Sequence, residues 1–168
     1  SCNTSSIGAR TRRRDAALSA MPPRVEFYVL PESLAAARFA CDMTERARRE
    51  GLSVHIHAAS RDDALELNDL LWTFRDISFL PHCLADEIRD PGSVPVVVGW
   101  AGMPPRSHDL LINLDDDIPG FAAAFSRVVE PVPARSSERG RSREHWRRYK
   151  EMGCELQNHD FEGANGDA

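Results

Sequence analysis

Short runs of β-branched, aliphatic and aromatic residues alternate with longer segments of helical pattern along most of this chain. The predicted strands are 25–30, 52–58, 95–99, 109–114 and 128–132, and the predicted helices are 34–50, 61–72, about 121–127 and 138–152. Strands that alternate with helices form a twisted, mostly parallel sheet with helices on both faces. The sequence therefore predicts an α/β protein with three α/β/α layers and a sheet of about five strands.

The ends of the predicted helices carry residues that commonly begin or end helices. Ser33 is expected to cap the first helix, and Ser60 with Asp63 has the spacing of a capping box at the second. Gly51 and Gly153 follow the first and the last helix, where glycine commonly ends a helix. These residues predict where the first two helices begin and where the first and the last helix end.

The first turn from strand to helix indicates whether a sheet of this class can hold a nucleotide by its phosphates. It reads YVLPESLAAAR and contains neither G-x-G-x-x-G nor G-x-x-x-x-G-K-[ST]. The backbone of this turn cannot approach a pyrophosphate as those glycine motifs do. A Rossmann dehydrogenase and a P-loop enzyme are therefore disfavoured.

The 168 residues suit one globular domain, since 42% are hydrophobic and 28% are charged. We expect a single domain over 21–156, a disordered extension or over-long gene start over 1–20, and a flexible acidic tail over 157–168. The apolar runs are far shorter than the roughly 20 residues that a transmembrane helix needs. Four widely spaced cysteines show no zinc or disulfide pattern. A cytoplasmic protein without membrane contact, metal or cofactor is predicted.

Two groups of residues could carry chemistry. Asp115, Asp116 and Asp117 follow a predicted strand, where carboxylates can bind Mg²⁺. Asp116 or Asp117 also suits the N-cap of the following helix, with Pro119 in its first turn, and we favour this interpretation. His55 and His57 lie on one face of a strand, which permits a metal pair, although a half-exposed sheet face is the favoured interpretation because no third ligand is evident. No active site can be assembled from these residues.

Large aromatic residues gather in 71–82, which reads LWTFRDISFLPH. Trp72, Phe74 and Phe79 lie there between a helix end and a loop that ends in proline. Such residues either fill the core or form a surface for a partner protein, and the sequence leaves both alternatives open.

The last predicted helix is basic although the whole chain has a net charge of −5. Residues 135–152 carry seven basic and three acidic side chains, whereas 21–134 are strongly acidic. Arg139, Arg143, Trp146, Arg147 and Lys150 fall at spacings of three, four and seven, so they share one helix face. Cations beside an indole suit an acidic peptide that ends in an apolar side chain and a carboxylate. A solvated charged face would explain the cations without the aromatic residues.

From Met21 to about Leu156 the chain resembles the chi subunit of bacterial DNA polymerase III, an accessory subunit of the clamp loader. The resemblance rests on VEFYVL, LNDLLWTFRDISFLPH, DLLINL, FSRVVEPVP and RSREHWRRYKEMGCEL, which occur in the order and at the spacing of that family. It implies a noncatalytic adaptor in DNA replication, with a nucleotide-binding-like fold that lacks a nucleotide site.

The resemblance also implies two binding surfaces. One docks the psi subunit, which links the protein to the clamp loader, and the matching residues are Trp72, Phe79, Pro81 and His82. The other binds the acidic C-terminal tail of single-stranded DNA-binding protein, and the matching residues are Val132, Arg139, Arg143, Trp146 and Arg147. DNA would be reached only indirectly. The alternatives are an α/β enzyme with a Mg²⁺ site at Asp115–Asp117, and a protein that binds nucleic acid directly through 135–152.

Overall fold

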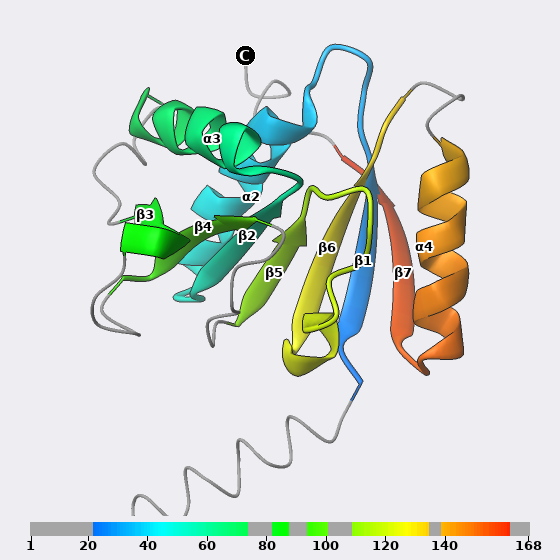
Figure 1. Ribbon diagram of the computed structural model, residues 1–168. Helices are drawn as coiled ribbons and strands as arrows, with labels where there is room; N and C mark the ends of the chain where they lie inside the picture. Colours follow the sequence, from blue (N-terminus) through cyan, green and yellow to red (C-terminus); the bar gives the residue numbers. More distant parts are fainter. Residues whose placement is uncertain (1–21, 74–81, 88–93, 101–108, 135–138, 162–168) are drawn as a thin grey trace, which may run out of the picture.

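The computed structural model describes residues 22–73, 82–87, 94–100, 109–134 and 139–161. Within them strands and helices alternate along most of the chain as predicted, but the helix predicted at about 121–127 is only the 3₁₀ turn Ala122–Ala124 (Figure 1). The elements are β1 (Arg24–Val29), α2 (Ala36–Arg49), β2 (Val54–Ala58), α3 (Arg61–Thr73), β3 (His82–Leu84), β4 (Val96–Trp100), β5 (Leu110–Asn113), β6 (Arg127–Val132), α4 (Arg139–Glu151) and β7 (Glu155–Asp160), with two short 3₁₀ turns, η2 (Ala85–Glu87) and η3 (Ala122–Ala124).

The strands form one sheet in the order β3-β4-β2-β5-β6-β1-β7, and every neighbouring pair is parallel. The predicted α/β class and parallel sheet are confirmed, but the described residues form seven strands and not about five. The two unpredicted strands are the edges, β3 and β7. β3 has three residues, and β7 is the polar segment ELQNHD, so neither has the apolar pattern of a buried strand.

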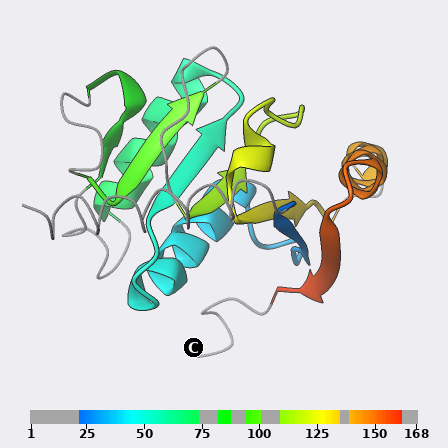
Figure 2. The same ribbon diagram turned by 90° about the horizontal axis from the view of Figure 1, so that it is seen from below.

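The sheet separates two apolar cores. On one face, α2 and α3 pack against β2, β4 and β5 through residues such as Phe39, Leu67 and Ile56. On the other face, Phe27, Leu111 and Val128 pack with Phe125 and with Tyr149 of α4. Figure 2 shows α4 and α2 on opposite sides of the sheet. The predicted three layers are therefore present.

β7 lengthens the domain beyond its predicted end. It pairs with β1 along all six residues, and Phe161 after it is buried with its ring centroid 4.8 Å from that of Phe39. The predicted boundary at 156 and the flexible tail predicted from 157 are therefore wrong over 157–161. Pairing of β7 with β1 and burial of Phe161 fix this polar segment to the rest of the domain. The extension predicted over 1–20 lies outside the described residues.

Most of the predicted helix ends are confirmed. The backbone N–H of Asp63 donates to Ser60 Oγ at 3.2 Å, and Gly51 and Gly153 follow α2 and α4 with φ of 81° and 83°, a conformation that favours glycine. The cap at Ser33 is wrong, because α2 begins at Ala36 and Ala35 precedes it without a side-chain cap. In the described residues, no helix has the length and apolar character needed to cross a membrane.

His55 and His57 are buried, so the predicted half-exposed face is wrong. Their exposed fractions are 1% and 3%, because the segment after β5 covers this part of β2 and places Phe121 5.6 Å from His55 and 5.4 Å from His57, measured between ring centroids. His57 Nε2 lies 3.1 Å from Asp115 Oδ2. Burial lowers the pKa of His57 more than Asp115 raises it, which favours the neutral imidazole.

Candidate peptide-binding site

A groove of about 330 Å³ lies between α4 and the strands β1, β6 and β7. Figure 1 shows α4 running beside these strands at one end of the sheet. We call it the α4 groove, and its lining residues are Phe27, Val29, Val132, Arg139, Ser142, Arg143, Trp146 and Asn158. Four of the five residues predicted to bind an acidic peptide are thus brought together: Val132, Arg139, Arg143 and Trp146.

The floor of the α4 groove is apolar. Trp146 packs on Phe27 with ring centroids 5.1 Å apart and planes tilted by 55°, and Phe27 meets the buried ring of Tyr149 edge-on at 6.1 Å. Val132 is buried to 9% exposure beside them. Aromatic rings with tilted and edge-on contacts form a stable wall for an apolar side chain.

The cations of α4 differ in what they contact. Arg141 forms an ion pair with Asp116, and Arg147 pairs with Glu144 at 2.5 Å and with Glu151 at 3.5 Å. Arg139 Nε donates to the carbonyl of Pro133 at 3.4 Å. Arg143 is exposed at the groove and forms no ion pair with any residue in the described part of the chain. Arg143 is therefore the groove cation best placed to receive an external anion.

Arg147 does not line the α4 groove, although it was predicted with the other four residues. Its side chain is 62% exposed and lies among carboxylates of its own helix. Exposed pairs of this kind contribute little to stability, but they keep the guanidinium charge locally balanced. Any contact of Arg147 with a peptide would have to lie outside the groove.

Sequence reasoning missed four lining residues of the groove: Phe27, Val29, Ser142 and Asn158. Strand periodicity places Phe27 and Val29 on one face of β1, and this face could have been assigned to α4 had the position of β1 been known. Ser142 lies one position before Arg143. Asn158 had no signal, because β7 was not predicted as a strand.

At the opposite end of the sheet, Trp72 is 53% exposed at the end of α3. Its ring centroid lies 4.2 Å from that of His82, which is buried at 6% exposure in the edge strand β3. This exposure favours the surface interpretation over the core interpretation for Trp72. Phe74, Phe79 and Pro81 lie outside the described residues.

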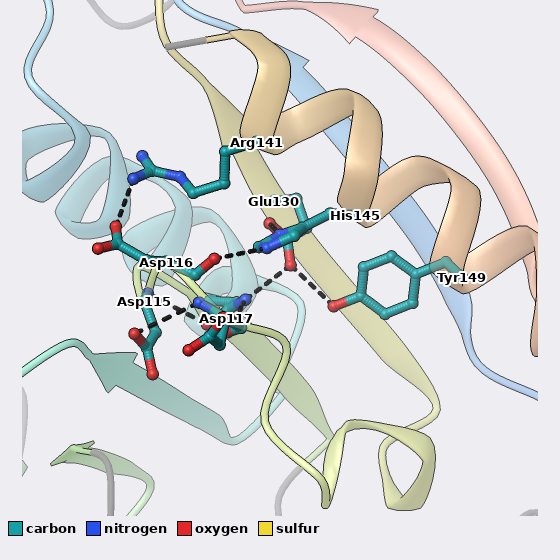
Figure 3. A network of polar contacts seen from close by, with 8 residues as sticks. Asp115, Asp116, Asp117, Glu130, Arg141, His145 and Tyr149 are labelled. Carbon is teal, nitrogen blue, oxygen red and sulfur yellow. Dashed lines mark hydrogen bonds and ion pairs between the residues drawn. The ribbon is translucent and has the colours of Figure 1, made fainter.

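The residues Asp115–Asp117 form a polar loop after β5, seen in Figure 3. Asp115 contacts His57, Asp116 pairs with Arg141, and the N–H of Asp117 donates to Asp115 Oδ1 at 3.4 Å. The predicted helix cap is wrong, because η3 begins after Phe121 and has no side-chain cap. The carboxylates of Asp115 and Asp116 contact different partners and thereby connect this loop to β2 and to α4.

A larger cavity of about 680 Å³ lies on the other side of the α4 N-terminus. It is lined by the ends of β1, β5 and β6, the start of α2, and the side chains of Arg141, Ser142 and His145 on α4. Ser142 lines both cavities, so the first turns of α4 separate them. Acidic residues are prominent here, with Glu32, Asp115 and Glu130 in the lining. This cavity is therefore a poorer match for an acidic peptide than the α4 groove.

Comparison with known proteins identifies the family of this chain. The family model described as DNA polymerase III chi subunit, HolC, matches residues 21–157. The chain belongs to this family. It is 43% identical over 139 residues to the DNA polymerase III subunit chi of Pseudomonas aeruginosa, covering 81% of this chain and 95% of the relative.

Two further relatives carry the same name. The subunit chi of Haemophilus influenzae is 30% identical over 139 residues, covering 81% of this chain and 96% of the relative. That of Escherichia coli is 32% identical over 123 residues, covering 73% and 83%. The predicted family is confirmed, and membership makes this chain a chi subunit, an accessory subunit of the replicative DNA polymerase.

Proposed function

We propose that this chi subunit is a noncatalytic adaptor that connects the psi subunit, and through it the clamp loader, to the acidic C-terminal tail of single-stranded DNA-binding protein. The tail binds in the α4 groove, and psi binds at the end of the sheet that carries Trp72 and His82. The protein acts in the bacterial cytoplasm at the replisome and reaches DNA only indirectly.

The observation that carries this proposal is an exposed arginine without an ion pair in the described structure, placed above an apolar floor. Arg143 can present two parallel N–H donors to the two oxygens of a peptide's terminal carboxylate. Trp146, Phe27 and Val132 lie beside it for the last apolar side chain. Arg139 adds positive charge for acidic residues that precede the terminus.

The charge distribution of α4 disfavours direct binding of nucleic acid. A protein that binds phosphates nonspecifically presents many unpaired cations over a broad face. Here Arg141 and Arg147 contact carboxylates of the same chain, and the groove has a volume of only about 330 Å³ and is partly apolar. These features support recognition of one short anionic segment.

The exposed indole of Trp72 supports the second part of the proposal. Tryptophan is among the residues that contribute most to protein interfaces. The indole of Trp72 is already half exposed to water at an edge of the domain, so a partner can cover it without rearrangement of the core. The buried imidazole of His82 packs against this indole. Psi is assigned to this end because the family resemblance covers both residues.

The decisive experiment titrates the chi subunit with full-length single-stranded DNA-binding protein and with a form that lacks its C-terminal tail. We expect binding of the first and loss of binding of the second. A synthetic tail peptide with a free terminal carboxylate should bind, and the same peptide with a terminal amide should bind much more weakly. Equal binding of the full-length and the truncated single-stranded DNA-binding protein would contradict the proposal. Tight binding of a single-stranded oligonucleotide alone would favour the nucleic-acid alternative.

A further inference from the structure

Helix α4 is held on the sheet by an unusual set of side chains. Its residues Arg139–Glu151 include no aliphatic side chain, and its buried residues are His145 and Tyr149. By comparison, α2 buries seven residues, Phe39 and Met43 among them. Burial of aliphatic side chains is the usual stabilising contribution for a helix that covers a sheet. The attachment of α4 must therefore depend strongly on the contacts of its two buried residues and of Trp146.

His145 and Tyr149 both contact Glu130, which is 4% exposed on β6 (Figure 3). His145 Nδ1 lies 2.9 Å from Glu130 Oε1, and the Tyr149 hydroxyl donates to Glu130 Oε2 at 2.7 Å. Asn113 Nδ2 donates to the same Oε2 at 2.7 Å. We call Glu130, His145, Tyr149 and Asn113 the Glu130 cluster. It connects α4 to β5 and β6 through buried hydrogen bonds.

The hydrogen bonds of His145 determine how many protons the Glu130 cluster holds. His145 Nε2 lies 2.7 Å from the carbonyl oxygen of Asp116, which can only accept, so Nε2 carries a hydrogen. The contact between Nδ1 and Glu130 Oε1 needs a second hydrogen, either on His145 or on Glu130. In both cases the pair retains one proton beyond a neutral imidazole and a carboxylate, and its net charge is zero.

Other charged and titratable groups face His145 from the surrounding elements. Glu130 comes from β6, Asp116 from the polar loop, and Arg141 and Glu144 from α4 itself, while Glu32 and Asp115 line the adjacent cavity. Burial lowers the pKa of His145, but the hydrogen bond and charge of Glu130 and the bond to Asp116 outweigh it, so the pKa is raised above 6.5. Burial raises the pKa of Tyr149, and Glu130 raises it further, so this phenol stays neutral.

The Glu130 cluster and the α4 groove share their supporting elements. Glu130 lies between Val128 and Val132 on the same face of β6, and Val132 lines the groove. His145 is adjacent to Trp146 and lies within one helical turn of Ser142 and Arg143. Tyr149 contacts Phe27 of the groove floor edge-on. A displacement of His145 from Glu130 would therefore move Arg143 and Trp146 relative to β1.

We infer that Glu130 and His145 are positioning residues of the α4 groove, and that they hold α4 in its peptide-binding position through one shared buried proton. This inference rests on the proposed binding of an acidic peptide, whose affinity would then depend on pH although neither residue touches the peptide. Loss of the proton leaves an imidazole lone pair facing the Glu130 carboxylate, which repels it and loosens the N-terminal half of α4.

The sign of the pH dependence follows from the raised pKa of His145. The contribution of the pair is fully present below the unfolded value of about 6.5 and is lost as pH rises through the folded value. Arginine and the carboxylates of the peptide do not titrate between pH 6 and 9. Acetylation of the peptide N-terminus removes the remaining group with a pKa near this range.

The test measures the affinity of an acetylated acidic tail peptide for the intact chi subunit between pH 6 and 9. Wild type should lose affinity by about three- to tenfold as pH rises, the size expected for coupling between neighbouring groups. Glu130→Gln should be nearly independent of pH, because its amide can donate to neutral His145 Nδ1 and its carbonyl can accept from Tyr149 and Asn113. A wild-type affinity that stays constant, or a Glu130→Gln profile equal to that of wild type, would overturn the inference.

Glu26→Gln is the matched control. Glu26 is also a buried glutamate, but it faces away from α4 and pairs with Arg127, which does not titrate in this range. This variant should keep the pH profile of wild type, and loss of the profile would contradict the assignment to Glu130. His145→Gln removes the titrating ring and serves as a second variant if Glu130→Gln fails to fold. It should bind the peptide weakly, with an affinity that does not change with pH. A steep profile in His145→Gln would likewise contradict the assignment.

A second readout separates this inference from the proposed function. Amide hydrogen exchange over 139–151 in the free protein, corrected for the intrinsic effect of pH, should show that α4 loses protection as pH rises in wild type and keeps it in Glu130→Gln. If the peptide fails to bind at any pH while this difference is present, the proposed function is wrong and the positioning role stands. If protection is unchanged in both proteins, the positioning role is wrong.

Discussion

The two ends of the sheet present surfaces with opposite physical character. At the β7 end, a basic helix lies over an apolar groove, and Arg143 is exposed there without an ion pair in the described structure. At the β3 end, the exposed residue is Trp72, which rests on the buried ring of His82. The first surface offers charge-assisted hydrogen bonds, and the second offers apolar area. Binding at the two ends should therefore respond differently to salt and to mutation.

Substitution of Arg143 should give the largest effect and should be confined to the β7 end. A charge-assisted hydrogen bond is worth roughly 1.5 to 3 kcal/mol, so Arg143→Ala should weaken binding of the tail peptide by about 10- to 150-fold. Arg143→Lys should recover part of this loss, because lysine keeps the charge but loses the bidentate geometry. The measurement is titration of a labelled tail peptide.

Arg148→Ala is the control for this prediction. Arg148 is an exposed arginine of the same helix and does not line the groove, so its removal changes the net charge equally. It should leave peptide binding almost unchanged. Equal losses in the two variants would mean that α4 attracts the peptide only through its total charge.

Substitution of Trp72 should affect the β3 end alone. Aromatic residues at the centre of an interface often contribute about 2 kcal/mol or more, so Trp72→Ala should weaken binding of psi by roughly 30-fold. Peptide binding should be unchanged. Phe79→Ala is expected to abolish co-purification with psi in the same way. Psi bound to immobilised variants can be quantified directly, and unfolding of the free Phe79→Ala protein would assign that residue to the core.

Salt should separate the two ends by a smaller amount. Screening shortens the range of charge interactions from about 10 Å at 0.1 M to about 3 Å at 1 M ionic strength. Affinity for the tail peptide should fall several-fold over this range, whereas affinity for psi, which we assign to apolar contacts, should change less. Parallel titrations of both partners at each salt concentration test this, and an equal response would remove the distinction between the ends.

The smallest expected effect concerns the chain's own acidic segment. Residues 115–120 read DDDIPG, which resembles an acidic tail but is internal and so has no terminal carboxylate. In the structure Asp116 pairs with Arg141 on the cavity side of α4, away from Arg143. A synthetic peptide of residues 112–121 should therefore not displace the bound tail peptide at comparable concentration. Efficient displacement would show that the groove does not need the terminal carboxylate.

Local features of the fold could be predicted from the sequence because they depend on neighbouring residues. The φ of Gly153 and the cap of Ser60 on Asp63 are properties of a few consecutive residues. The helical spacing of Arg139, Arg143 and Trp146 likewise places them on one face without knowledge of the rest of the chain. The cap predicted at Ser33 failed because the chain forms a turn between Pro31 and Leu34 before α2 begins.

The candidate site could be predicted only in part. Val132, Arg139, Arg143 and Trp146 were assigned through the family resemblance and meet in the α4 groove. Phe27 and Asn158 were missed, because they come from strands at opposite ends of the chain that become neighbours when β7 pairs with β1. That pairing was not predicted, since a polar edge strand lacks the apolar alternation by which buried strands are recognised.

Burial and charge state depended on packing between distant elements. His55 and His57 are on one face of β2 by strand geometry alone, but they are buried because Phe121 and Phe125 pack over them. Glu130 has no unusual neighbours in the sequence, and it meets His145 and Tyr149 only where α4 lies on β6. Periodicity determines which way a side chain points. The element that covers the side chain is decided only when distant parts of the chain pack together, and that packing sets the exposure and the protonation of the side chain.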